Sequence, residues 1–340
     1  MAVLSIPKSV VLELTYKCNH HCKFCSCPWF APNSTYPNRE ELSVTDWKKA
    51  IDILFQQGVE FFSISGGEAI LKEGFDEILW YIREQSDIRD ILDHPIVLIS
   101  NALAMKEDYL KLFKDLNVHL SMSLPGYETF QEHTGVDNAE GVLHWFTVAK
   151  SMGIKATLNV TVTKKNYDEL FQTISMGLLN GAHDILLNRF LPGGRGLAYM
   201  DELCLTPEQV NGMLDTAEEV LEYAKRYGNV GTEIPLCAIK NTGKYKRVHI
   251  GYQCAAAKGF FVVDPSGQIR TCNHSPRIVG NIFDTPMISD TYYWNMFAKS
   301  DYMPDSCSEC KLSQYCDCGC REVANILHHS PKEKDTSIIQ

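Results

Sequence analysis

The sequence contains no apolar run of about 18 residues, the length that a membrane-spanning helix needs. Residues 1–9 lack a basic stretch followed by an apolar core, so we expect no secretion signal and a cytoplasmic protein. Positive charge is also scarce, because 32 Lys and Arg residues face 42 Asp and Glu residues and leave a net charge of −10. A nucleic-acid binder needs a basic stripe, so we expect neither a nucleic-acid nor a membrane partner.

Cysteine, in contrast, is abundant, with 13 residues in a chain of 340. The cysteines concentrate in two stretches, residues 18–27 and residues 237–320. Disulfides occur mainly in secreted proteins, whereas cysteines at ligand spacing in a chain without an export signal favour metal binding. We therefore interpret both stretches as metal-binding, with Cys27 outside the first motif as a small buried apolar side chain.

The first stretch has the spacing C-x3-C-x2-C, formed by Cys18, Cys22 and Cys25 directly after an apolar run that predicts a strand. Three thiolates on one tight loop can hold three corners of a cubane iron–sulfur cluster. The fourth iron then stays open, as it must if a substrate or cofactor is to bind the metal directly. A zinc loop is the alternative, although zinc sites more often pair C-x2-C motifs and close all four positions.

Between residues 8 and 195 the sequence alternates between strand and helix patterns. Strands are predicted at residues 10–14, 59–65, 95–100, 118–123, 154–162 and 184–190, and helices at residues 43–58, 75–84, 107–116, 139–152 and 168–179. This order predicts a parallel α/β sheet with right-handed crossovers, whose function lies at the carboxyl ends of the strands. The cysteine loop, Gly66-Gly67-Glu68 and Ser100-Asn101 follow the first three strands, so we expect them to lie together.

The later part of the chain has a less regular pattern. Residues 191–203 include Pro192-Gly193-Gly194-Arg195-Gly196 and predict an irregular linker. A capping box at Thr206 opens a helix that we expect to run to about Tyr227 and to bridge two domains. A β-hairpin is predicted at residues 259–271, around the turn Asp264-Pro265-Ser266-Gly267.

The loop of Cys18, Cys22 and Cys25, with aromatic Phe24, resembles the signature of the radical S-adenosylmethionine (radical SAM) superfamily. In that family the three cysteines hold a [4Fe–4S] cluster whose open iron binds SAM, and reduction cleaves SAM to a 5′-deoxyadenosyl radical. The family fold is a partial (β/α)6 TIM-like barrel, which the resemblance predicts for residues 8–195. It assigns to SAM binding the residues Phe24, Gly66, Gly67, Glu68, Ser100, Asn101, Ser123 and Asn159. Ala69 and Pro125 stand where the family commonly has Pro and Asp.

The second stretch resembles the SPASM domain, which carries two auxiliary [4Fe–4S] clusters in radical SAM enzymes that modify peptides. The G-x4-C spacing ends at Cys272, and C-x2-C-x5-C-x3-C runs from Cys307 to Cys320. The resemblance implies that the first auxiliary cluster is held by Cys237, Cys254, Cys272 and Cys320. It implies that the second is held by Cys307, Cys310 and Cys316, and we expect Cys318 as its fourth ligand because no cysteine follows Cys320. The alternatives are an iron bound by Asp317, water or a substrate thiol, and a zinc ribbon at the C-x2-C pair.

The resemblance implies an oxidoreductase, a peptide-modifying maturase that abstracts hydrogen from a peptide or protein and produces a crosslink or an oxidised side chain. An electron donor such as a flavodoxin or ferredoxin would be a second partner. The alternatives are an enzyme of cofactor or tetrapyrrole maturation and a non-catalytic iron–sulfur or zinc scaffold. We assign no catalytic acid or base, because pKa depends on burial; His20 and His21 are expected to be solvated loop residues.

These patterns divide the chain into four parts. We expect the barrel at residues 1–196, a linker with the bridging helix at residues 197–236, the cysteine-rich SPASM domain with its hairpin at residues 237–327, and a tail at residues 328–340.

Overall fold

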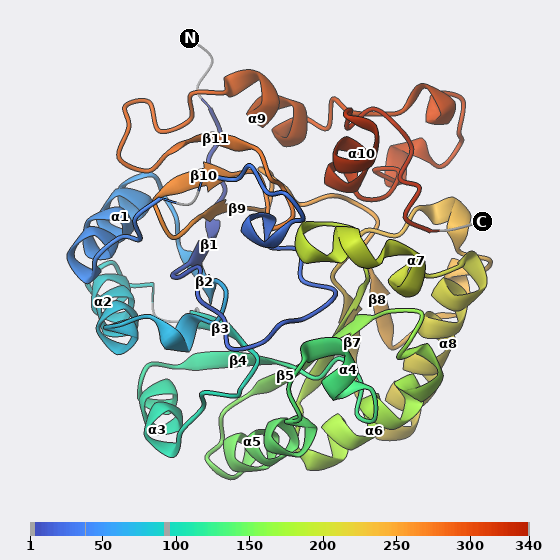
Figure 1. Cartoon of the computed structure of the whole chain (residues 1–340), viewed down its shortest axis with the longest axis horizontal. Helices are drawn as coiled ribbons and strands as arrows, with labels where there is room; N and C mark the ends of the chain where they lie inside the picture. The colour runs from blue at the N-terminus through green and yellow to red at the C-terminus, as the bar shows by residue number, and fades with distance from the viewer. Residues whose placement is uncertain (1–3, 38, 92–95, 339–340) are drawn as a thin grey trace.

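One curved sheet organises the molecule. The structure is a computed structural model that describes residues 4–37, 39–91 and 96–338. Within these residues the sheet has 11 strands in the order β11-β10-β9-β1-β2-β3-β4-β5-β6-β7-β8. Figure 1 shows the strands curving around the centre of the molecule, with the helices α1, α2, α3, α5, α6 and α8 around the outside.

The six predicted barrel strands are confirmed and lie side by side in chain order. They are β1 (Ser9–Glu13), β2 (Phe61–Ser65), β3 (Ile96–Ser100), β4 (Val118–Ser123), β5 (Ala156–Val162) and β6 (Asp184–Arg189). Each pairs in parallel with the next. Pro95, where the third predicted strand begins, lies outside the described residues. Because all six strands point the same way, their carboxyl ends share one edge.

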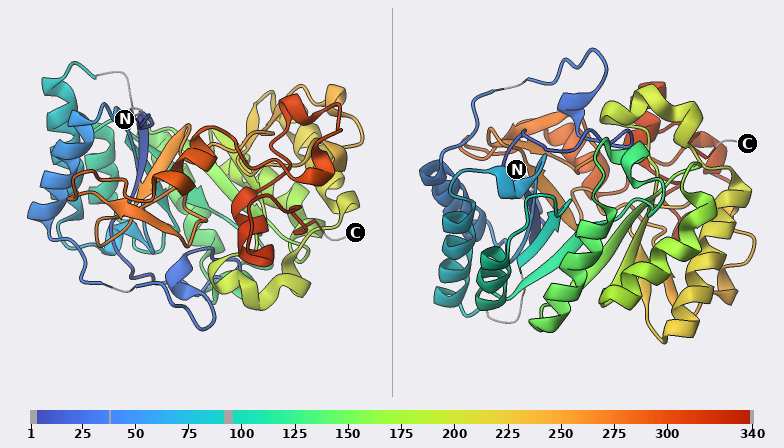
Figure 2. Two further views of the ribbon diagram at one scale, coloured as in Figure 1. Left: turned by 90° about the horizontal axis from the view of Figure 1, so that it is seen from above. Right: turned by 60° about the horizontal axis from the view of Figure 1, so that its bottom comes forward.

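Helices cover the outer side of this sheet, as Figure 2 shows from two further directions. They are α1 (Val44–Gln56), α2 (Phe75–Ile88), α3 (Glu107–Asp115), α5 (Ala139–Ser151) and α6 (Leu170–Asn180), with the short α4 (Phe130–Thr134) between β4 and α5. Ser43 caps α1 by accepting a hydrogen bond from the Asp46 N–H. Apolar residues of α1, among them Trp47 and Leu54, are buried against the sheet.

The region after β6 is more regular than predicted. Residues 191–203, expected to be an irregular linker, form a 3₁₀-helix (Gly194–Tyr199) followed by α7 (Met200–Leu203). The helix α8 (Pro207–Ala224) has the predicted capping box but ends before Tyr227, because the chain turns at Lys225 to start another strand. Two short parallel strands, β7 (Gly228–Val230) and β8 (Val248–Ile250), extend the arc beyond β6. The helix α8 packs on α6, in the outer layer.

The predicted hairpin is confirmed as β9 (Phe260–Val263) and β10 (Gln268–Arg270), and β11 (Ile278–Asn281) pairs with β10. Asp264 fixes the turn, because its carboxylate accepts the N–H groups of Ser266 and Gln268, both at 2.9 Å. The strand β9 also pairs in parallel with β1. The cysteine-rich region is thereby joined to the free edge of the barrel by backbone hydrogen bonds.

The rest of the carboxyl-terminal region has little regular structure. It contains α9 (Thr291–Ala298), α10 (Arg321–His328) and four single 3₁₀ turns, at Leu236–Ala238, Thr242–Lys244, Asp305–Cys307 and Ser313–Tyr315. In the described residues, three more such turns lie earlier in the chain, at Pro28–Phe30, Ala69–Leu71 and Tyr167–Glu169. None of the described helices is long and apolar enough to cross a bilayer. The sheet is continuous across the predicted domain limits, which stay a prediction.

Candidate iron–sulfur and cofactor site

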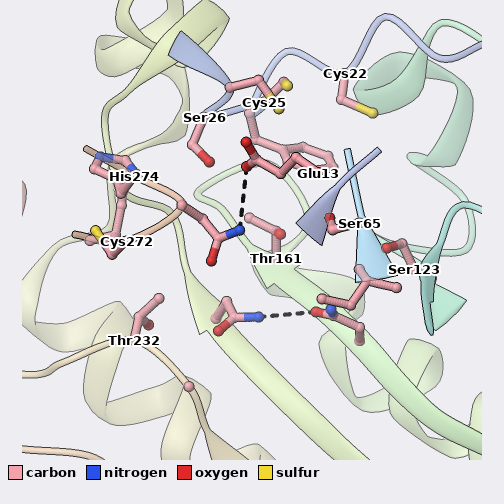
Figure 3. Close-up of a pocket in the computed structure, with 18 of the residues that line it drawn as sticks. Glu13, Cys22, Cys25, Ser26, Ser65, Ser123, Thr161, Thr232, Cys272 and His274 are labelled. Atoms are coloured by element: carbon pink, nitrogen blue, oxygen red, sulfur yellow. Dashed lines mark hydrogen bonds between the residues drawn. The ribbon is translucent and has the colours of Figure 1, made fainter. Parts of the chain in front are cut away.

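The carboxyl ends of the barrel strands open into a cavity of about 440 Å³. The cysteine loop after β1 forms part of its wall, and the segment after β10 forms another. Figure 3 shows Cys22 and Cys25 at one edge of the cavity and Cys272 with His274 on a different side. The cavity is lined by every residue that the sequence assigned to SAM binding: Phe24, Gly66, Gly67, Glu68, Ser100, Asn101, Ser123 and Asn159. The fold thus brings these residues together.

The cysteine loop lies in close contact with the end of β2. The Gly67 N–H donates to the Thr15 carbonyl and the Glu68 N–H donates to the Lys17 carbonyl, both at 2.8 Å. A Cβ atom on Gly67 would stand 2.1 Å from the Lys17 carbonyl oxygen. Gly66 has a φ of +146°, which also favours glycine. The paired glycines therefore let two backbone segments approach at the site.

The turn at residues 192–196 holds the other side of the loop. The Arg195 guanidinium donates to the Cys22 carbonyl at 3.1 Å, and the Gly196 N–H donates to the Cys25 carbonyl at 3.2 Å. Burial raises the pKa of the Cys18 and Cys22 thiols, and the Arg195 charge acts in the opposite direction. Sequence reasoning missed this clamp because it interpreted the Gly-Gly-Arg-Gly segment as a linker.

Glu68, which is 2% exposed, joins the ends of β2 and β3. Its carboxylate accepts hydrogen bonds from Ser100 Oγ at 2.9 Å, from the Asn101 N–H at 2.7 Å and from the Ile70 N–H at 3.4 Å. Burial raises its pKa to about 7, and the three donors oppose that rise. A carboxylate has about four acceptor positions, so one is left for a cation in the cavity.

Amides line the floor of the cavity. Asn188 Nδ2 donates to Asn159 Oδ1 at 3.0 Å, and Asn159 Nδ2 donates to Ser121 Oγ at 3.4 Å. Asn101 Nδ2 donates to Asn19 Oδ1 at 2.7 Å, which ties the end of β3 to the cysteine loop. These hydrogen bonds fix the positions of amide side chains that stand among apolar strand residues. Asn101, Asn159 and Asn188 all line the cavity.

The donor set fits an iron–sulfur cluster better than a single ion. In the part of the chain that the structure describes, no three His, Cys, Asp or Glu side chains gather closely enough to hold one metal ion. Cys18, Cys22 and Cys25 nevertheless line one cavity, as a larger four-iron cluster requires. His20 Nε2 is buried there without a hydrogen-bond partner among the described residues, which a bound group can supply.

Two residues of the cysteine loop, His20 and Cys27, have surroundings that differ from the predicted ones. His20, expected to be solvated, is 3% exposed because it packs edge-on against Phe130, and burial lowers its pKa to about 4. His21 is exposed, as expected. Cys27, expected in apolar packing, lies half-buried on the cavity wall with its Sγ 3.8 Å from the Gly66 carbonyl oxygen. The polar cavity, and not the core, therefore surrounds both His20 and Cys27.

The carboxyl-terminal thiols form two groups. The inner group, Cys254, Cys272 and Cys320, lines the same cavity as the amino-terminal loop. The thiol pKa of Cys254 and of Cys320 is raised first by burial and next by the charge of Glu233. The thiol pKa of Cys272 is raised first by burial and next by Glu322. Thiols and carboxylates from four loops therefore share this wall.

The outer group contains Cys237, Cys307, Cys310, Cys316 and Cys318. The Leu236 N–H donates to Cys316 Sγ at 3.4 Å, and the Cys318 N–H donates to the same sulfur at 3.3 Å. The thiol pKa of Cys237 is raised first by burial and then by Cys316, Cys307 and Cys310. The resemblance grouped Cys237 with the inner cysteines, whereas the structure places it beside the outer ones, because the turn at Leu236–Ala238 packs on Cys316.

Sequence reasoning also missed Glu13, a cavity residue that ends β1. Its carboxylate forms an ion pair with Arg270 and accepts a hydrogen bond from Asn273 Nδ2 at 3.5 Å, the bond drawn at Glu13 in Figure 3. Burial raises the pKa of Glu13, and the Arg270 charge opposes this effect. A single acidic residue at the end of an apolar strand was the available signal.

Known proteins resemble this chain in both sequence and fold. The sequence model of the Radical SAM superfamily matches residues 12–176. The PqqA peptide cyclase of Granulibacter bethesdensis is 24% identical over 96% of this chain and 86% of that protein. The AdoMet-dependent heme synthase of Methanosarcina barkeri is 25% identical over 95% of this chain and 94% of that protein. The crystal structure of Streptococcus suis SuiB bound to S-adenosylmethionine has a TM-score of 0.72 at 17% identity, covering 99% of this chain and 78% of that one.

A parallel partial barrel with three loop cysteines at its carboxyl edge defines a SAM-dependent iron–sulfur protein. The chain belongs to the radical SAM superfamily. Its cysteine-rich region, joined to β1 through the β9–β10 hairpin, has the SPASM architecture of related structures. SAM and one [4Fe–4S] cluster are the cofactors of this family.

Proposed function

We propose that the protein is a peptide-modifying maturase, which abstracts a hydrogen atom from a peptide or protein and leads to a crosslink or an oxidised side chain. The observation that carries this proposal is the single cavity that joins the cysteine loop, the Gly66-Gly67-Glu68 segment and the inner thiols. A substrate in that cavity lies between the SAM site and the proposed first auxiliary cluster. The precursor-peptide complex of SuiB, with a TM-score of 0.71, supports the same use of the fold.

The residues of the site have separable roles in this proposal. Cys18, Cys22 and Cys25 hold the first cluster, and Glu68 accepts the ammonium group of SAM through its remaining lone pair. When bound, the cluster and SAM would supply the radical chemistry, with the electron coming from a donor such as a flavodoxin or ferredoxin. The two auxiliary clusters would be held by the inner and outer thiols.

The charge of the cavity favours a peptide over a tetrapyrrole, the substrate class that the heme synthase relative suggests. Four carboxylates line the cavity, those of Glu13, Glu68, Glu233 and Glu322, and of these Glu13 is paired with Arg270 behind the wall. Among the described lining residues the only Lys or Arg is Arg189, which is already paired with Asp335 at 2.5 Å. A tetrapyrrole carries several carboxylates, which such a wall would repel. A neutral or cationic peptide segment meets no such repulsion.

The test is anaerobic reconstitution with iron and sulfide, followed by reduction with dithionite in the presence of SAM. We expect 5′-deoxyadenosine, and with a substrate peptide we expect a product that has lost two hydrogen atoms. Peptides encoded beside the gene are the first candidates. Absence of any 5′-deoxyadenosine would remove the catalytic interpretation and leave the non-catalytic scaffold. Turnover of a tetrapyrrole, with every tested peptide inert, would favour the cofactor-maturation alternative.

A further inference from the structure

The inner thiol group has three cysteines, one fewer than a closed cubane cluster needs. Cys254 lies before β9, Cys272 follows β10, and Cys320 immediately precedes α10. All three line the main cavity. In the described residues the other carboxyl-terminal thiols do not line it. A fourth protein ligand for this group must therefore come from another side chain on the same wall.

Glu233 is such a side chain. It follows β7 and lines the cavity together with the three thiols. Its backbone is fixed, because its carbonyl oxygen accepts a hydrogen bond from Arg189 Nε at 3.0 Å. Its carboxylate is the charged group that acts most strongly on the Cys254 and Cys320 thiols, after burial, and it acts on Cys272 as well.

The carboxylate of Glu233 forms no ion pair among the described residues, although the Arg189 charge opposes the rise that burial gives its pKa. The nearest guanidinium, that of Arg189, already donates to Asp335 at 2.5 Å and to Ser337 Oγ at 2.7 Å. Glu233 is half-buried, and burial raises the pKa of its carboxyl group, so keeping it charged without an ion pair is costly. Proteins keep such groups paired or bound to metals. Its position beside three thiols therefore points to a metal partner.

Cys237, the fourth ligand that the family pattern implies, is held elsewhere. Its neighbour Leu236 donates its N–H to Cys316 Sγ, and Cys237 itself is exposed. It lies with the outer thiols and does not line the cavity. Bringing it to the inner group would require the turn at Leu236–Ala238 to leave Cys316.

We propose that the inner auxiliary cluster is held by Cys254, Cys272, Cys320 and the carboxylate of Glu233, and that Cys237 belongs to the outer cluster. The inference rests on the auxiliary clusters of the proposed function and assigns their ligands. A carboxylate oxygen is a harder and weaker ligand for iron–sulfur irons than a thiolate. The iron bound by Glu233 is thus the exchangeable corner, and it faces the cavity where a substrate thiolate could replace the carboxylate.

The test isolates the inner cluster. A background variant with Cys18, Cys22 and Cys25 replaced by Ala and Cys307 and Cys310 replaced by Ser lacks the first cluster's ligands and two of the outer thiols. The outer thiols that remain, Cys237, Cys316 and Cys318, are too few for a closed cluster, so we expect about four irons per chain. Adding Cys237→Ser should leave the iron content and Mössbauer spectrum unchanged. Adding Glu233→Gln should alter the parameters of one iron in four, and Glu233→Cys should give four equivalent thiolate-bound irons. Glu219→Gln, at an exposed position of α8, is the matched control.

The outcomes separate this inference from the proposed function. A cluster that is lost in Cys237→Ser, or unchanged in Glu233→Gln, overturns the ligand assignment alone. A folded background that binds no iron overturns both the assignment and the auxiliary clusters of the proposed function. If the background variant does not fold, the difference spectrum between the parent protein and its Glu233→Gln variant is measured instead. It should show a change in one of about 12 irons and should be flat for Glu219→Gln.

Discussion

The two thiol-bearing regions of this protein are built in opposite ways. In the amino-terminal region Cys18, Cys22 and Cys25 stand on one loop, which backbone hydrogen bonds clamp from β2, from α4 and from the 192–196 turn. In the carboxyl-terminal region eight thiols come from loops between residues 237 and 320, and the fold sorts them into an inner and an outer group. Ligands on one loop are fixed by local spacing, whereas dispersed ligands are fixed only by how distant loops pack.

The largest effect should come from removing the local site. Replacing Cys18, Cys22 and Cys25 together by Ala should abolish SAM cleavage, because no other proposed cluster offers an iron at the Gly66-Gly67-Glu68 segment. The auxiliary iron, about eight atoms per chain, should remain. Iron analysis and 5′-deoxyadenosine assays measure both effects. Continued cleavage in the triple variant would show that the SAM site lies in the other thiol region.

The second prediction concerns the packing that holds the loop. Gly67→Ala should lose about four irons per chain, because its Cβ would stand 2.1 Å from the Lys17 carbonyl oxygen and displace the loop. Gly243→Ala is the control, because its Cβ would meet only Asn241 Oδ1, at 3.5 Å. Iron content after reconstitution is the measurement. Equal iron content in both variants would mean that the cysteine loop can move and still bind a cluster. It would contradict the view that the backbone hydrogen bonds to the segment after β2 hold the loop rigidly.

The third prediction tests what ties the dispersed region to the barrel. Asp335 accepts hydrogen bonds from Arg189 on β6 at 2.5 Å and from the Cys320 N–H at 2.8 Å. Asp335→Asn should lower the free energy of unfolding by about 3–5 kcal/mol, because Arg189 stays buried without its partner. The exposed Asp301→Asn should cost less than about 1 kcal/mol. Denaturant titration measures the free energy of unfolding of both variants. Similar decreases in the two would contradict the role of Asp335 in joining this region to the barrel.

The sign of the pH dependence of this tie follows from the pKa of Asp335. Burial acts to raise that pKa, but the Arg189 charge and the Ser337 and Cys320 donors together lower it. The pair therefore contributes stability above the unfolded-state pKa of about 4. That contribution should be lost as the pH falls through the lower folded-state value. Asp335→Asn should lack this acid-dependent loss.

The fourth prediction concerns Glu68. Glu68→Gln should weaken SAM binding by about tenfold or more, since a charged acceptor is worth about 1.5–3 kcal/mol to an ammonium group. Because burial raises the Glu68 pKa to about 7, SAM affinity in the parent should increase as the pH rises through 7 and the carboxylate forms. Isothermal titration from pH 6 to pH 8 should show this increase, and the Gln variant should lack it. Equal affinity and pH profile would remove the role given to Glu68.

The smallest effect is expected in the outer group. It offers five thiols for four iron positions, with Cys318 the ligand expected from the sequence and Cys237 within reach. Either Cys318→Ser or Cys237→Ser alone should leave the total iron within about one atom per chain, because the other thiol fills the corner. The double variant should lose the outer cluster. A full loss in one single variant would identify that cysteine as indispensable.

The sequence by itself determined the local features of this protein. The order of the strand and helix patterns specified six parallel strands, because strands that alternate with helices pair in parallel through right-handed crossovers. The C-x3-C-x2-C spacing specified the cluster loop, and the two glycines after β2 indicated close backbone approach. The hairpin at residues 259–271 was readable from its Asp-Pro-Ser-Gly turn. All of these depend on neighbours in the chain.

Only the tertiary structure decided the contacts between distant segments. The pairing of β9 with β1, the Arg195 clamp, and the ion pairs of Glu13 with Arg270 and of Arg189 with Asp335 join residues more than 140 positions apart. Cys237 lies with the outer thiols and Glu233 with the inner ones for the same reason. Sequence spacing fixes where a thiol stands along the chain, but the packing of separate loops decides which thiols can share one cluster.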